Sequence, residues 1–171
     1  MSTAVGKWYT RALYDIVDQT LNLTSDTLKL VPIGTGYVFD PDHTAFDDGT
    51  NSSTDLSFNE ITCTNYTPGY GSSSRKTATL TKQVNNTDNR LDIAIADITW
   101  SALGGTAGGD TTIGCFVLVK PGASSDATTR PIAYFERKDG SGNKVNVATN
   151  GSDVTVDFET LGNGGNLRLS V

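Results

Sequence analysis

Residues 113–120 read IGCFVLVK, and residues 131–137, one loop later, read PIAYFER. The run CFVLV is continuously apolar, which is typical of a strand that is buried on both of its faces. The loop between the two segments is rich in Gly, Ser and Asp, which favour turns over regular structure. These segments therefore predict strands over Ile113–Lys120 and Pro131–Arg137.

Working outward from this pair, short apolar segments recur along the chain, and turn-forming Gly, Asn, Asp, Ser or Pro residues separate them. Within one of them Leu91, Ile93 and Ile95 alternate with other residues and share one strand face. Strands and helices do not alternate, so the pattern predicts an all-β fold: an antiparallel, jelly-roll-like β-sandwich. The further predicted strands are Leu21–Ile33, Phe58–Thr64, Thr77–Val84, Arg90–Ile95, Val145–Ala148, Val154–Glu159 and Leu167–Val171.

The composition supports strands and turns over helices. The chain holds 25 Thr, 14 Ser, 12 Asn and 18 Gly, and 16 of its 19 acidic residues are Asp. One short helix is predicted at Lys7–Gln19, where Tyr9, Leu13, Ile16 and Val17 share a face that would pack on a sheet.

The predicted organisation is a single domain over residues 1–171. Residues 1–20 form its N-terminal helical segment, and residues 34–55, which include DPDHTAFDDGTNSSTD, form a long exposed loop without apolar periodicity.

Charge and hydropathy exclude several partner classes. The net charge is −6 and no Lys/Arg cluster occurs, which argues against nucleic-acid binding. No apolar run reaches the length of a membrane span, and the start MSTAVGKWYTR lacks the apolar stretch of a signal peptide. We therefore expect a soluble protein made in the cytoplasm, without nucleic-acid or membrane partners. Cys63 and Cys115 lack a CxxC arrangement and are expected to be reduced thiols in the core.

Each enzyme template lacks residues that it needs. His43 is the only histidine and no GxSxG elbow is present, so we expect a solvated loop histidine rather than a catalytic base. The segment GYGSSSRKT at 69–77 lacks the glycines of a phosphate loop and leads into a strand. Zinc ligands are too few. We therefore predict no enzymatic activity and no cofactor, although paired carboxylates of a small glycoside hydrolase, such as Glu136 or Glu159, are not excluded.

The Asp-rich stretch raises the question of calcium. Five aspartates lie between positions 40 and 55, and hard cations prefer several oxygen ligands. The EF-hand pattern is absent, because Ala45 and Asn51 stand where it needs Gly and Glu. The sequence leaves open whether this loop binds calcium or only forms turns.

Several longer segments resemble the small virion structural proteins of tailed bacteriophages, the group that includes capsid decoration or cement proteins. They are ALYDIVDQTLNLTSDTLKLVPI (12–33), RLDIAIADITWSAL (90–103), IGCFVLVKPG (113–122), RPIAYFE (130–136) and DVTVDFETLGNGGNLRLSV (153–171). The resemblance implies a non-enzymatic β-sandwich in many copies on the outside of an icosahedral head, where it clamps neighbouring major capsid subunits.

A protein of this kind is expected on the capsid surface, with the major capsid protein as partner. It is also expected to be a homo-oligomer, a dimer or trimer, because linked copies bind a shell more tightly. The N-terminal aromatics Trp8, Tyr9 and Tyr14 are candidate partner or oligomer contacts, and the alternative is that two of them cover the end of the sandwich. Two other functions stay open: a tail- or fibre-associated structural protein, and a carbohydrate-binding β-sandwich module with exposed aromatic residues.

Overall fold

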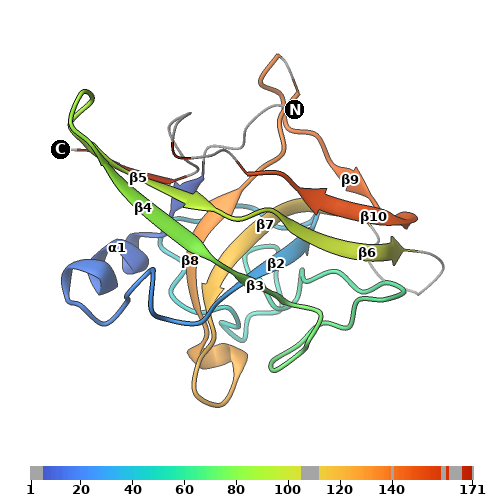
Figure 1. Cartoon of the computed structure of the whole chain (residues 1–171). Coiled ribbons are helices and arrows are strands. Elements are labelled where there is room, and N and C mark those ends of the chain that lie inside the picture. The colour runs from blue at the N-terminus through green and yellow to red at the C-terminus, as the bar shows by residue number, and fades with distance from the viewer. Residues whose placement is uncertain (1–5, 105–111, 140, 159–160, 162–166, 171) are drawn as a thin grey trace.

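Three antiparallel β-sheets and one short helix make up the computed structural model (Figure 1). It describes residues 6–104, 112–139, 141–158, 161 and 167–170. All the strand pairs run antiparallel, which confirms the β-rich, antiparallel character predicted from the sequence. No helix among the described residues is long and apolar enough to cross a membrane.

The largest sheet is built around β7, which contains the apolar run CFVLV. Strand β9 pairs with the first residues of β7, whereas β8 pairs with its second half. The order of the main path is β1 (Lys7–Trp8), β8 (Arg130–Phe135), β7 (Thr112–Lys120), β2 (Leu28–Gly34) and β3 (Lys76–Ala78), with β9 (Val147–Ala148) beside β7.

The remaining strands form two smaller sheets that cross in front of β8, β7 and β2 in Figure 1. One contains β4 (Leu80–Asn85), β5 (Arg90–Ile95) and β11 (Leu167–Ser170). The other pairs β6 (Ile98–Gly104) with β10 (Asn150–Val156). The segment Thr77–Val84, predicted as one strand, is divided at Thr79 between β3 and β4.

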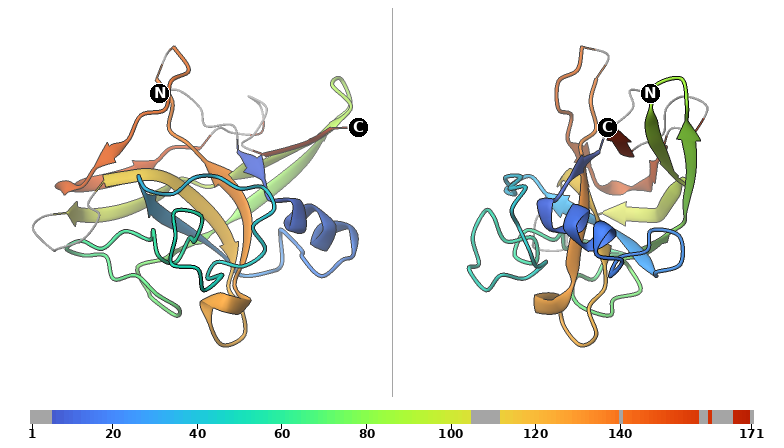
Figure 2. Two further views of the ribbon diagram at one scale, coloured as in Figure 1. Left: turned by 180° about the vertical axis from the view of Figure 1, so that it is seen from behind. Right: turned by 90° about the vertical axis from the view of Figure 1, so that its left-hand side faces the viewer.

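Both faces of the largest sheet are covered, as the side view in Figure 2 shows. On one face Phe116 of β7 stacks on Trp100 of β6, with ring centroids 5.7 Å apart. On the other face lies the coil between β2 and β3, where Phe39 packs on Tyr134 of β8 at 4.7 Å. Residues 113–119 are all buried, so the prediction of a strand buried on both faces is confirmed.

The helix α1 spans Thr10–Val17 and is shorter than predicted, because Lys7 and Trp8 belong to β1. Of the predicted inward face, Tyr9 is buried and Ile16 packs against the core, whereas Leu13 and Val17 are 36% and 82% exposed. Ala12 and Asp15 complete the side that faces the protein. The physical reason for this orientation is Tyr9, which is fully buried at the helix start and is held there by its hydroxyl contact with Tyr37.

The prediction of a long exposed loop at residues 34–55 is wrong in one respect. No helix or strand follows Gly34 in this segment, as expected, but Tyr37, His43, Phe46 and Asp55 are buried. The segment covers a face of the largest sheet, and its apolar side chains are spaced irregularly because coil has no fixed period.

The predicted strand Phe58–Thr64 is also wrong. Only isolated bridges form there, between Ile33 and Glu60 and between Cys63 and Tyr66. The Asp55 carboxylate accepts the backbone N–H groups of Ser57 and Phe58, so a turn replaces the start of the strand.

Candidate functional site

The three predicted contact residues near the N-terminus point in different directions. Tyr9 is fully buried, and its hydroxyl lies 2.9 Å from that of Tyr37. Trp8 is half-buried, and its Nε1 donates to the carbonyl oxygen of Arg168. Tyr14 is 56% exposed, with the Arg11 guanidinium 4.8 Å from its ring centre. Of the three, only Tyr14 presents most of its side chain to solvent.

Tyr14 belongs to an apolar surface that we call the α1 outer face, made of Leu13, Tyr14 and Val17. Val17 follows Tyr14 by three residues and Leu13 by four, so its side chain neighbours both on the helix surface. The inner side of the same helix carries Asp15, whose carboxylate binds Arg11 at 2.8 Å. Ala12 and Ile16 also pack toward the core, so the helix buries two apolar residues, Ile16 in part, and one charged residue while it leaves three apolar residues exposed.

Beneath the helix lies an aromatic cluster of Tyr9, Tyr37, Phe39 and Tyr134. Burial raises the pKa of Tyr37 to about 12 and that of Tyr9 well above its usual range. Burial and the neighbouring Cys115 raise the pKa of Tyr134, whose hydroxyl donates to Glu136 at 2.7 Å. These phenols stay protonated in the folded protein and act as hydrogen-bonding core residues.

His43 lies beside this cluster and is buried, so the expectation of a solvated loop histidine is wrong. Its ring packs edge-on against Tyr9 and Tyr37 at centroid distances of 6.5 and 6.4 Å. Its Nε2 has no hydrogen-bond partner among the described residues. In the described structure the imidazole packs against aromatic side chains of the core.

The Asp-rich segment uses its carboxylates to cap turns. Asp40 accepts the backbone N–H of Asp42, Asp47 that of Gly49, and Asp48 that of Thr50, each at 2.9 Å. These are the short-range bonds for which Asp is favoured in turns. In the part of the chain that the structure describes, no three His, Cys, Asp or Glu side chains converge as metal ligands would.

Sequence reasoning missed a buried ion network centred on Arg75, because it tested the segment around Arg75 only as a phosphate loop. Its guanidinium binds Glu60 at 2.5 and 2.9 Å and Asp126 at 2.6 and 2.9 Å, and it lies 4.4 Å from the ring centre of Phe46. The Tyr66 hydroxyl adds a bond to Glu60 at 2.6 Å. Burial disfavours the charged guanidinium, but the two carboxylates outweigh it and raise the pKa of Arg75.

Both cysteines are buried and free, as predicted. Cys115, which faces Tyr134, is 1% exposed, and burial raises its pKa to about 12. Burial also raises the pKa of Cys63. A thiol with a raised pKa is a poor nucleophile at neutral pH, so both residues act as small apolar side chains.

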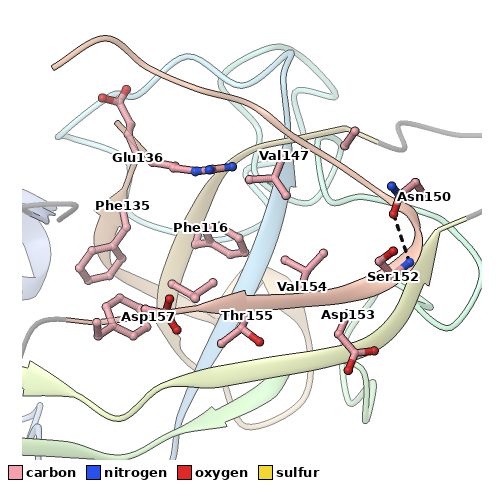
Figure 3. Close-up of a pocket in the computed structure, with 14 residues that line it drawn as sticks. Phe116, Phe135, Glu136, Val147, Asn150, Ser152, Asp153, Val154, Thr155 and Asp157 are labelled. Atoms are coloured by element: carbon pink, nitrogen blue, oxygen red, sulfur yellow. Dashed lines mark hydrogen bonds between the residues drawn. The ribbon is translucent and has the colours of Figure 1, made fainter. Parts of the chain in front are cut away.

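A cavity of about 440 Å³ lies between β10 and the largest sheet (Figure 3). Its apolar lining comes from Phe116, Phe135, Val147 and Val154. Glu136 also lines it, whereas the other acid considered for a hydrolase, Glu159, lies outside the described residues. The volume is within the range of small-ligand and peptide-anchor pockets.

Trp100 is not available to stack on a sugar in a carbohydrate-binding module. It is 2% exposed, and its Nε1 donates to the carbonyl oxygen of Ser74 at 2.8 Å. Its ring packs on Phe116 inside the protein.

Comparison of the chain with protein-family models, with curated proteins and with solved structures found no match in any of the three.

Proposed function

We propose that this protein is a non-enzymatic virion structural protein of the capsid decoration or cement type. In this role it binds the outside of an icosahedral head and stabilises contacts between major capsid subunits. The observation that carries the proposal is the α1 outer face, where Leu13, Tyr14 and Val17 are 36%, 56% and 82% exposed. Exposed apolar groups that lie together are typical of surfaces that bind other proteins.

The proposed fold is a jelly-roll-like β-sandwich, in which β4, β5, β6 and β10 form the layer opposite the largest sheet. Two ring contacts between the layers support it: Trp100 with Phe116, and Phe135 with Phe158 at 5.4 Å. A rigid scaffold of this kind favours binding, because its contact residues are already ordered and lose little conformational entropy when a partner binds. An experimental structure with the two layers apart would contradict this part of the proposal.

The proposal includes self-association into a dimer or trimer. Several weak contacts held in one oligomer give a large combined affinity, since each later contact forms within the same complex. A bound oligomer that contacts the assembled shell, but not its separated subunits, stabilises the shell by mass action.

The test is co-sedimentation of the purified protein with mature shells that have been stripped of it. We expect saturable binding at a fixed number of copies per shell subunit, and shells that resist heating better once loaded. A few copies per particle would indicate a tail- or fibre-associated protein instead, and no binding at high excess would contradict the proposal.

A matched pair of variants locates the contact. Val17→Ser changes the α1 outer face, whereas Val84→Ser makes the same change on the distant strand β4, where Val84 is 67% exposed. We expect Val17→Ser to weaken shell binding or self-association by about tenfold, the effect of losing one buried valine, while Val84→Ser leaves both unchanged. Equal behaviour of the two variants would remove α1 from the interface.

A further inference from the structure

Strands β9 and β10 follow one another in the chain but do not pair. β9 pairs with β7 of the largest sheet, whereas β10 pairs with β6 of the opposite layer. Only Thr149 separates them, so the chain passes from one layer to the other at this point. The cavity of about 440 Å³ lies between β10 and the largest sheet, next to this crossing (Figure 3).

The lining of the cavity shows that it follows the edge of β10. Side chains in a strand alternate between two faces, so a pocket on one face would touch every second residue. Here all seven consecutive residues of 152–158 line it. β10 pairs with β6 along its other edge, with Val154 opposite Trp100 and Val156 opposite Ile98, and it has no second strand neighbour among the described residues.

A strand edge of this kind presents backbone N–H and C=O groups that another extended segment can bind. The edge of β10 is unusual because the neighbouring space has an apolar wall. Phe116 and Phe135 form its back, Val147 lies on one side and Val154 on the other (Figure 3). An added strand would therefore gain both backbone hydrogen bonds and a pocket for one of its side chains.

The charges around the cavity define the partner further. Glu136 and Asp157 line it with carboxylates and Arg137 with a guanidinium, while the third acidic lining residue, Asp153, accepts the backbone N–H of Ala102. The whole chain carries a net charge of −6. A bound segment is therefore favoured when it carries Lys or Arg beside its apolar residues, because opposite charges steer and orient partners.

We propose that β10 is a strand-addition site for an extended segment of a partner protein in which apolar and basic residues alternate. The segment pairs with the edge of β10 opposite β6, inserts one apolar side chain against Phe116 and Phe135, and places its basic residues near Asp157 and Glu136. This inference rests on the proposed function, since it names the kind of segment through which the protein would bind another virion subunit.

The test uses a defined probe, the peptide acetyl-Lys-Val-Lys-Val-Lys-Val-amide, titrated into isotope-labelled protein and followed by NMR. We expect saturable shifts of the backbone amide signals of residues 150–156. The same peptide with N-methylated valine amides keeps its charge and side chains but loses backbone donors. We expect it to bind about tenfold more weakly, the effect of losing a few hydrogen bonds.

Two pairs of protein variants complete the design. Val156→Trp fills the cavity, and Val84→Trp places the same ring on β4, away from it; we expect only the first to block the peptide. Asp157→Asn removes a negative charge beside the cavity, and Asp18→Asn removes one at the C-terminal end of α1, away from the cavity. We expect only Asp157→Asn to weaken binding, by a few-fold and less at high salt.

The outcomes separate this inference from the proposed function. Equal binding of the N-methylated peptide would overturn strand addition and indicate a pocket for small amphiphilic molecules instead. Absence of β10 shifts at millimolar peptide would also overturn it. Neither result depends on shells, so co-sedimentation can succeed while the peptide fails, or fail while the peptide binds.

Discussion

Among single residues, Arg75 links three segments that lie outside the β-strands, through contacts with Glu60, Asp126 and Phe46. Glu60 lies in the coil before β3, and Asp126 lies in the short 3₁₀ helix Asp126–Thr128 before β8. Arg75 binds both carboxylates and covers Phe46. One buried cation therefore ties together segments that have no sheet hydrogen bonds with each other.

We expect Arg75→Met to lower the free energy of unfolding by about 3–5 kcal/mol, because it leaves two buried carboxylates without their cation. Arg137→Met is the control, since Arg137 is exposed, and it should change stability by no more than about 0.5 kcal/mol. Denaturant unfolding followed by tryptophan fluorescence measures both. A loss below about 1 kcal/mol for Arg75→Met would show that the network contributes little.

Gly104, at the end of β6, allows two segments to approach closely. Its φ is +124°, and a Cβ at this position would lie 2.4 Å from the carbonyl carbon of Thr149. Side chains rarely adopt such a φ, and this contact has no flexible group that could move aside. The chain crossing between β9 and β10 therefore depends on a glycine at position 104.

Gly104→Ala should destabilise the protein by about 2–4 kcal/mol, from backbone strain and overpacking together. Gly142→Ala is a matched control, because its φ is +83° but nothing lies within 4 Å of the added Cβ. We expect it to cost about 1 kcal/mol, the strain alone. Thermal melts of the two variants give the difference. Equal melting temperatures would show that the backbone at Thr149 shifts to accommodate the added methyl group at little energetic cost.

At the scale of elements, strands were predicted best where apolar residues follow one another or alternate. Strand β5 was predicted with its observed bounds, and β7 within one residue, because strand geometry imposes a period on their side chains. The composition of segment 58–64 favours a strand, but the Asp55 carboxylate binds the backbone N–H groups of Ser57 and Phe58, and a turn forms there instead. Such side-chain bonds to the backbone leave no periodic signal in the sequence.

The Asp-rich element, residues 40–55, allows a test of the calcium question that the sequence left open. Asp48 shows the competition most clearly, because its Oδ1 accepts both the N–H and the hydroxyl of Thr50. A cation would compete with these bonds for the same carboxylate. We therefore expect the melting temperature to be the same in millimolar calcium and in EDTA, whereas an upward shift with calcium would demonstrate a structural ion by linkage.

At the scale of the whole molecule, the coil of residues 35–75 has the role that a second sheet or helices usually have. It covers one face of the largest sheet, and the smaller sheets cover the other (Figure 2). Sequence reasoning predicted several of the strands, such as β5 and β7, but not this covering, because its contacts join residues far apart in the chain. The cavity beside β10 was missed for the same reason, since Phe116, Val147 and Val154 belong to three separate strands.

The buried phenols make the stability of the whole protein sensitive to alkali. Burial raises the pKa of Tyr9, Tyr37, Tyr66 and Tyr134, and that of Tyr37 reaches about 12. In the unfolded chain these groups ionise near pH 10, so above that pH the folded state holds more protons than the unfolded one. Stability is therefore complete below about pH 10 and falls as pH rises further, by up to about 1.4 kcal/mol per pH unit for each tyrosine.

Denaturant unfolding at a series of pH values, with tyrosinate absorbance as a second signal, measures this dependence. We expect the unfolding midpoint to fall steeply above about pH 10, and tyrosinate absorbance to rise together with unfolding. Tyr9→Phe removes one of the ionising groups, so its stability should decline less steeply with pH, even if the variant is less stable at neutral pH because Tyr37 loses its hydroxyl partner. A midpoint that stays constant to about pH 12 would mean that the phenols ionise alike in both states, and that the aromatic cluster is open to water.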